Sequence, residues 1–168
     1  MATVSDPYII AEAAQGYLPL DGSEGSADTA LLLVRGAAAA GADAVKFQVV
    51  YVSELAQPGN PYYEILLRLE MSEDQWTRIA RFARESGIDF VVDVFGPRSL
   101  QVARACDVTG VKIHSTSFFD HQLVSRVLEL GCPVYFSVGG IETDEILAFI
   151  DRHRLRGRSD VTLLYGFQ

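Results

Sequence analysis

The two lysines of the chain are the residues whose placement most directly suggests chemistry. Of its 14 basic residues, only Lys46 and Lys112 are lysine, and all the others are arginine. Each lysine lies inside a short apolar segment, where an ammonium group is costly to bury without a partner. A compact point charge, rather than the planar fork of arginine, is kept at these two positions. We interpret the pair as two cations that converge on one anion.

Further polar side chains follow the lysines and the other apolar segments. Gln48 lies two residues after Lys46, and His114 lies two residues after Lys112, so the members of each pair share one face of a strand. The other polar residues near predicted strand ends are Glu12, Asp93, Ser115, Ser137 and Gln168. The carboxyl ends of parallel strands meet at one edge, where α/β proteins place their sites. We therefore predict one site that joins these residues.

A purely structural interpretation of the same residues remains open. Glu12 or Asp93 could neutralise each lysine in a buried ion-pair network that binds no ligand. If the lysines hold an anion, replacing either by methionine abolishes anion binding and leaves the fold intact. If they neutralise carboxylates, the same change strands a buried carboxylate and costs about 3–5 kcal/mol of stability.

Short apolar strands alternate with helices along the whole chain. Strands are expected near residues 8–12, 44–49, 89–94, 110–114, 133–138 and 161–165. Glycines such as Gly41 and Gly87 separate a helix from the strand that follows it. The best-specified helix begins at the capping box of Ser72 and Gln75.

This alternation predicts an α/β fold with a parallel sheet of the (β/α) TIM-barrel type. A complete barrel needs about 200–250 residues. We therefore expect one incomplete barrel domain over residues 1–168, with about six of the eight βα units, as in a truncated chain or gene fragment. An open doubly wound sheet is the alternative. Two sheet edges would be exposed, so a homo-oligomer or a completing partner chain is expected to cover them.

Charge and composition exclude several classes of partner. A net charge of −8 argues against nucleic acid and acidic membranes. No apolar run reaches the roughly 18 residues of a membrane span and no leader is recognisable, so we expect a cytoplasmic protein. Cys106 and Cys132 lack metal or redox spacing, and both are expected to be reduced and buried. His121 and His153 fall in helical segments and are expected at the surface.

Five segments resemble, in the same order, the N-acetylneuraminate (sialic acid) synthase family. They are Ile10-Ala11-Glu12, Ala40 to Gln48, Tyr63-Glu64 with Leu69-Glu70-Met71-Ser72, Val111-Lys112-Ile113 with Ser115, and Leu163-Leu164-Tyr165-Gly166. The resemblance implies a (β/α)8 barrel that condenses phosphoenolpyruvate with an N-acetylated sugar aldehyde, in an aldol-type reaction that gives a sialic-acid-like nonulosonate. It also implies a divalent metal, manganese or magnesium.

The resemblance assigns roles to several of the predicted site residues. The phosphoenolpyruvate anion would be held by Lys46, Lys112, Gln48 and Ser115. Glu12 would lie near the sugar or the condensing carbon. The chain departs from the family pattern at Gln15-Gly16-Tyr17, at Val92-Asp93 and near Ser117, where the family has a glutamate. The phosphoenolpyruvate pocket is therefore better supported than the sugar pocket.

The metal is expected to lie outside this chain. In the family its histidine ligands belong to the seventh and eighth units, beyond Gln168, and no histidine here matches them. We therefore expect no synthase turnover from the isolated chain. Two other functions stay open: a Schiff-base aldolase in which one lysine is the nucleophile, and a degenerate barrel fragment that acts as a non-catalytic binding or interaction module.

Overall fold

The computed structural model describes residues 7–20 and 23–166, which form a single parallel sheet with its helices. Neighbouring strands in space are also neighbours in sequence, in the order β1-β2-β3-β4-β5-β6. The strands are β1 (Ile10–Ala14), β2 (Ala44–Gln48), β3 (Asp89–Val94), β4 (Gly110–Ile113), β5 (Val134–Ser137) and β6 (Val161–Leu164). This sequential order is that of an incomplete (β/α) barrel, and it excludes the doubly wound alternative, whose strand order reverses.

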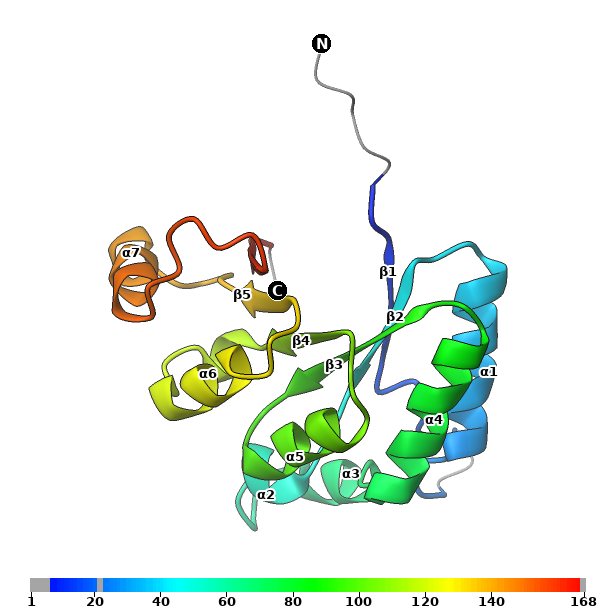
Figure 1. Cartoon of the computed structure of the whole chain (residues 1–168). Coiled ribbons are helices and arrows are strands. Elements are labelled where there is room, and N and C mark those ends of the chain that lie inside the picture. Colours follow the sequence, from blue (N-terminus) through cyan, green and yellow to red (C-terminus); the bar gives the residue numbers. More distant parts are fainter. Residues whose placement is uncertain (1–6, 21–22, 167–168) are drawn as a thin grey trace.

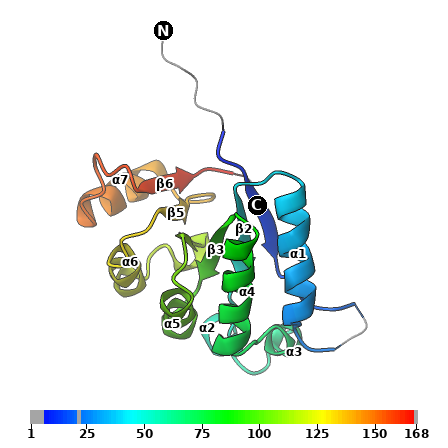
Figure 2. The same cartoon turned by 45° about the vertical axis from the view of Figure 1, so that its right-hand side comes forward.

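The long helices cover one face of the curved sheet and leave the other face uncovered (Figure 1). The helical segments are α1 (Ala27–Ala39), α2 (Val52–Leu55), α3 (Tyr63–Arg68), α4 (Glu73–Glu85), α5 (Pro97–Ala105), the 3₁₀ turn η1 (Ser115–Ser117), α6 (His121–Leu128) and α7 (Thr143–Arg152). Helices α1 and α4 pack side by side, whereas α2 and α3 lie at the carboxyl end of the sheet (Figure 2). The uncovered face is the one that would line a barrel interior.

Local sequence explains where the helices begin and end. In α4, Ser72 Oγ accepts from the Gln75 amide, and Gln75 Oε1 accepts from the Ser72 amide, which satisfies two donors of the first turn. Gly41 follows α1 with a φ of 79°, a left-handed conformation that glycine adopts without steric cost. The predicted capping box and helix-ending glycine are both confirmed.

Alternation along the strands separates the core from the predicted site. Phe47 of β2 packs against Trp76 of α4, with ring centroids 6.1 Å apart, and Tyr17 completes this aromatic cluster at 5.3 Å from Trp76. Because successive side chains point to opposite faces, the neighbours Lys46 and Gln48 lie on the uncovered face. Alternate side chains of β2 therefore lie either in the core or on the uncovered face, and the polar ones lie on the uncovered face.

The first strand begins two residues later than the sequence predicts. Ile10 pairs with Ala44, the first residue of β2. The Ile9 carbonyl still accepts from the Asp43 and Ala44 amides, but Tyr8 and Ile9 precede the paired residues and are exposed. Consequently Glu12 lies in the middle of β1 rather than at its end. The other strand predictions agree with the structure to within one residue at each end.

Two further predictions need correction. Cys106, which follows α5, is buried and free, but Cys132 lies just before β5 and is only half-buried. His121 and His153 are half-buried rather than on the surface, and their Nδ1 and Nε2 atoms lie 3.0 Å apart. The amphipathic packing of α6 against α7 brings these rings together beside Phe149, whose ring centroid lies 4.8 Å from that of His153.

Candidate functional site

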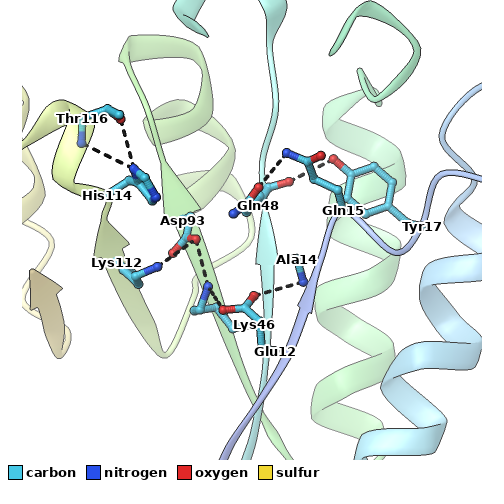
Figure 3. Close-up of polar contacts among 10 residues, drawn as sticks. All are labelled: Glu12, Ala14, Gln15, Tyr17, Lys46, Gln48, Asp93, Lys112, His114 and Thr116. Atoms are coloured by element: carbon cyan, nitrogen blue, oxygen red, sulfur yellow. Dashed lines mark hydrogen bonds and ion pairs between the residues drawn. The ribbon is translucent and has the colours of Figure 1, made fainter. Parts of the chain in front are cut away.

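Both lysines converge on one carboxylate on the uncovered face of the sheet. Lys46 Nζ lies 2.6 Å from Glu12 Oε2 and 2.8 Å from Asp93 Oδ2, and Lys112 Nζ lies 3.3 Å from the same Asp93 oxygen. Figure 3 shows Asp93 between the two ammonium groups. We call Glu12, Lys46, Asp93 and Lys112 the ion-pair cluster.

Strand register explains why residues so far apart in sequence meet. Glu12 is directly opposite Lys46, and Asp93 is directly opposite Lys112. Lys46 is opposite Val91, so it reaches Asp93 along the diagonal to the next residue on the same face. Three parallel pairings therefore place four charged side chains on one face.

The cluster is unevenly buried. Asp93 is fully inaccessible and the Lys46 side chain is 7% exposed, whereas the Glu12 side chain is 51% exposed. The formal charges of two ammonium and two carboxylate groups sum to zero, so the cations are not bare, and the structure shows the pairing that the ion-pair interpretation predicts. Lys46 already has two carboxylate partners. Lys112 Nζ contacts one within the described ranges, and thus keeps two N–H donors for a ligand.

His114 and Gln48 continue this face toward the carboxyl edge of the sheet. His114 Nδ1 lies 3.1 Å from Thr116 Oγ1, and burial, together with the positive charge of Lys112, lowers the pKa of the His114 ring. Gln48 Oε1 accepts from Gln15 Nε2 at 2.7 Å. Gln48 is the last residue of β2 and His114 directly follows β4, so each lies at the carboxyl end of the strand that carries its lysine (Figure 3).

A cavity of about 320 Å³ opens at this edge, above the ion-pair cluster. Its lining residues are Gln15, Gln48, Leu55, Asn60, Tyr62, Leu66, Phe95, His114 and Thr116. Only Gln48 and His114 were predicted. The others come from segments that follow strands β1 to β4, which is the usual source of ligand contacts in this type of fold. Their position after a strand was the signal available in the sequence.

A larger hollow, of about 530 Å³, lies elsewhere on the sheet and contains no lysine. Tyr8, Asp89 and Tyr135 are among its lining residues, and the Tyr8 hydroxyl donates to Asp89. Desolvation and the Asp89 carboxylate raise the pKa of Tyr8, so the phenol stays protonated. Neither hollow has a lysine among its lining residues, and we place the candidate site at the carboxyl edge because Gln48 and His114 there follow Lys46 and Lys112 in sequence.

The remaining predicted residues have separate outcomes. Ser137 is buried at the end of β5, and Ser115 begins the turn η1 directly after β4. Gln168 lies outside the described residues.

The residues present do not fit a divalent metal. Within residues 7–20 and 23–166, no three His, Cys, Asp or Glu side chains are grouped so that they could hold an ion. Both carboxylates of the ion-pair cluster face ammonium groups, which would repel a cation. We therefore assign no chemical step of these residues to a metal. The described part of the chain also has no helix long and apolar enough to cross a membrane.

Comparison with known proteins gives a consistent set of relatives. The chain is 28% identical over 158 residues to an uncharacterized protein of Methanocaldococcus jannaschii, covering 94% of this chain and 45% of that protein. It is 27% identical over 176 residues to an N-acetylneuraminate-9-phosphate synthase of Drosophila melanogaster, covering 96% and 45%. The chain thus spans about 45% of the length of these relatives.

Structural similarity agrees with the sequence matches. The N-acetylneuraminic acid (sialic acid) synthetase of Leptospira borgpetersenii, whose structure contains citrate, superposes with a TM-score of 0.84 at 22% identity. That similarity covers 96% of this chain and 54% of the synthetase chain, and it supports the fold. The model of one protein family matches residues 33–167, which is most of the sequence. The chain therefore belongs to the NeuB family.

Proposed function

We propose that this chain supplies the phosphoenolpyruvate-binding part of a C–C bond-forming synthase. The reaction would be the aldol-type condensation of phosphoenolpyruvate with an N-acetylated sugar aldehyde, giving a sialic-acid-like nonulosonate. The observation that carries the proposal is that Lys46 and Lys112 converge on Asp93 on the uncovered face of a NeuB-family sheet. The name of the Drosophila relative, an N-acetylneuraminate-9-phosphate synthase, supports the same reaction class.

The proposed roles follow from position and donor capacity. Lys112 keeps N–H donors for the anion, and Lys46 adds positive potential from the second strand. Gln48, His114, Ser115 and Ser137 would complete the substrate contacts as hydrogen-bonding groups, and Gln168 is assigned the same role by its sequence position. Glu12, half-exposed beside Lys46, would face the reacting carbon. Preorganised charges of this kind stabilise the charge that develops in a transition state.

The Schiff-base alternative is less well supported by the geometry. A lysine nucleophile must be present as the free amine, because the ammonium has no lone pair. Lys46 Nζ already contacts two carboxylates within 2.8 Å, so the nitrogen that would attack a carbonyl carbon is engaged in ion pairs. Failure of borohydride to trap a keto-acid on the protein is therefore the expected result.

Several parts of the proposal concern partners and location. The sugar substrate is the least defined partner, because the loop after β1 departs from the family pattern. The reaction would use a divalent metal, manganese or magnesium, bound by ligands other than the described residues. A second copy or a completing chain would cover the outer strands, and the location would be the cytoplasm.

Calorimetric titration of phosphoenolpyruvate tests the proposal directly. Lys112→Met should abolish binding, because Lys112 carries the available donors. Arg81→Met is a matched control that removes one cation from the exposed surface of α4 and should leave binding unchanged. Unchanged phosphoenolpyruvate affinity in Lys112→Met would contradict the proposed function. If the chain binds no anion at all, the non-catalytic module is the better account.

A further inference from the structure

Asp93 is the least satisfied charged group of the ion-pair cluster. Its Oδ2 atom accepts from both ammonium groups, whereas its Oδ1 atom is buried and has no hydrogen-bond partner within the described residues. Buried polar atoms nearly always have a hydrogen-bond partner. A buried carboxylate oxygen that accepts no hydrogen bond has lost its contacts with water and has gained none in the protein. The unpaired oxygen is thus a position where a proton or a donor would be stabilised.

The charge balance of the cluster opposes the binding of an anion. Two carboxylates already offset the two ammonium groups, and Asp93 and Lys46 are almost fully buried. An anion that enters beside Lys112 would add negative charge to a neutral site of low accessibility. An uncompensated charge at a site of low accessibility is costly. Anion binding therefore requires that one carboxylate become protonated or give up its contacts with the ammonium groups.

We propose that Asp93 is an internal counter-ion that competes with the anionic ligand for the two lysines, so that anion binding draws one proton from solvent onto Asp93 Oδ1. The new O–H bond forms at the oxygen that has no partner, and Oδ2 keeps accepting from Lys46. Lys46 also keeps Glu12 at 2.6 Å, so one ion pair survives. Lys112, whose contact with Asp93 is the longest at 3.3 Å, is released to the ligand.

This inference rests on the proposed function only in placing an anion at the lysines. It adds that the site admits its ligand together with a proton and that Asp93 sets the affinity. Neither phosphoenolpyruvate nor turnover is needed to test it.

His114 is the other group whose titration must be separated from that of Asp93. It lies two residues after Lys112 on the same face, and its pKa is lowered by burial and by Lys112, so it is mostly neutral near pH 7. An anion would also favour a proton on this ring. Glu12 on β1 and Lys46 on β2 are the remaining charged groups that face Asp93.

Sulfate is the suitable probe because, unlike phosphate, it does not titrate between pH 6 and 8. Calorimetry in two buffers of different ionisation enthalpy counts the protons taken up on binding. In His114→Gln we expect an uptake approaching one proton at pH 8, with sulfate affinity falling about tenfold per pH unit as pH rises. If the wild type takes up a proton and this variant does not, the proton belongs to His114 and the proposal is overturned. No uptake in either protein would overturn it as well.

Asp93→Asn removes the counter-ion and keeps the shape of the side chain. Sulfate affinity at pH 8 should then rise at least about tenfold, because Lys112 loses its carboxylate partner while Lys46 keeps Glu12. Proton uptake should be lower than in the wild type by the proton assigned to Asp93. Asp89→Asn is the matched control: it makes the same change at the other end of β3 and should leave the proton count unchanged. Affinity in Asp93→Asn that is no higher than in the wild type, or no sulfate binding in either protein, would overturn the proposal.

The outcome is separable from that of the proposed function. Proton-coupled sulfate binding without phosphoenolpyruvate binding would support the role of Asp93 and contradict the synthase. If Asp93→Asn does not fold, the proton count in His114→Gln decides the question alone.

Discussion

At the scale of single residues, the ion-pair cluster makes the two lysines unequal. Lys46 holds two carboxylates at 2.6 and 2.8 Å, whereas Lys112 holds one at 3.3 Å. Removing one partner of a buried pair is destabilising mainly because it leaves the other charge uncompensated. The lysines should therefore differ in what they contribute to stability and to binding.

Lys46→Met should lower the free energy of unfolding by about 3–5 kcal/mol, because the fully buried Asp93 carboxylate loses its nearest cation. Lys112→Met should cost less, since Asp93 keeps Lys46 at 2.8 Å. Urea unfolding of both variants, with Arg81→Met as a surface control, measures the difference. Equal losses, or a stabler Lys46→Met, would contradict the assignment of Lys46 as the structural cation.

Sequence reasoning found the charged residues of the site and the possibility that they pair, but not which carboxylate each lysine contacts. Lys46, Lys112 and Asp93 were identifiable because charges inside apolar strands are rare and demand partners. Which oxygen each ammonium would contact depends on strand register, which no local pattern fixes. Tyr62 and Asn60 of the cavity lie in a connecting segment, where nothing in the residue types distinguishes a ligand contact from a solvated turn.

At the scale of elements, helix α5 is held by a carboxylate from another helix. Glu54 of α2 accepts hydrogen bonds from the Arg98 and Ser99 amides in the first turn of α5. Gly96 is the N-cap, and a Cβ atom there would lie 2.7 Å from Glu54 Oε1. The contact between Glu54 and the first turn of α5 joins the segment that follows β2 to the segment that follows β3, beside the candidate site.

Gly96→Ala should destabilise the protein, because the methyl group would displace the Glu54 carboxylate from the helix terminus. A lost cap costs about 0.5–2 kcal/mol. In a Glu54→Ala background the same glycine change should cost much less, since the carboxylate is already gone. A double-mutant cycle by urea unfolding measures this coupling, and strict additivity of the two changes would refute the contact.

Helices α6 and α7 carry the pH-sensitive contact of the fold. His153 Nε2 lies 3.0 Å from His121 Nδ1, and burial, with the neighbouring His121, lowers the pKa of His153 below its usual value near 6.5. The unfolded chain then binds a proton more readily than the native protein. The contribution of His153 to stability is therefore full above the unfolded value near 6.5 and is lost as the pH falls from there through the lowered native pKa.

Thermal unfolding between pH 7.5 and 5 should show this loss, and His153→Gln should flatten that part of the profile. His114→Gln is the natural comparison, because the pKa of His114 is also lowered and its contribution must be subtracted. A profile that His153→Gln leaves unchanged would show that the α6–α7 contact does not titrate in this range.

Element prediction succeeded where local signals are strong. The capping box of Ser72 and Gln75 and the glycine after α1 are sufficient to place helix ends, because they satisfy or release particular backbone groups. The start of β1 could not be placed in the same way. Tyr8 and Ile9 are as apolar as the strand that follows, and only the position of β2 decides which residues find a partner.

At the scale of the whole molecule, the sheet has two outer strands. Within the described residues β1 pairs with β2 alone, and β6 pairs with β5 alone. Unpaired amide and carbonyl groups along such strands are a template for further pairing. The 168-residue chain studied by itself should therefore associate as its concentration rises, which sedimentation velocity over a hundredfold concentration range would reveal. A single monomeric species throughout would show that the edges are protected.

The sequential strand order also bears on how the chain reaches this state during synthesis. Every strand after β1 pairs with the strand that was synthesised just before it, across a connection that contains one to three helical segments. No strand pairs with one that is synthesised several units later. The chain segment that must close at each step is therefore no longer than one βα connection. The sheet can therefore form from the amino terminus, one βα unit at a time. At each stage the strand added last has a free edge on which the next strand can pair.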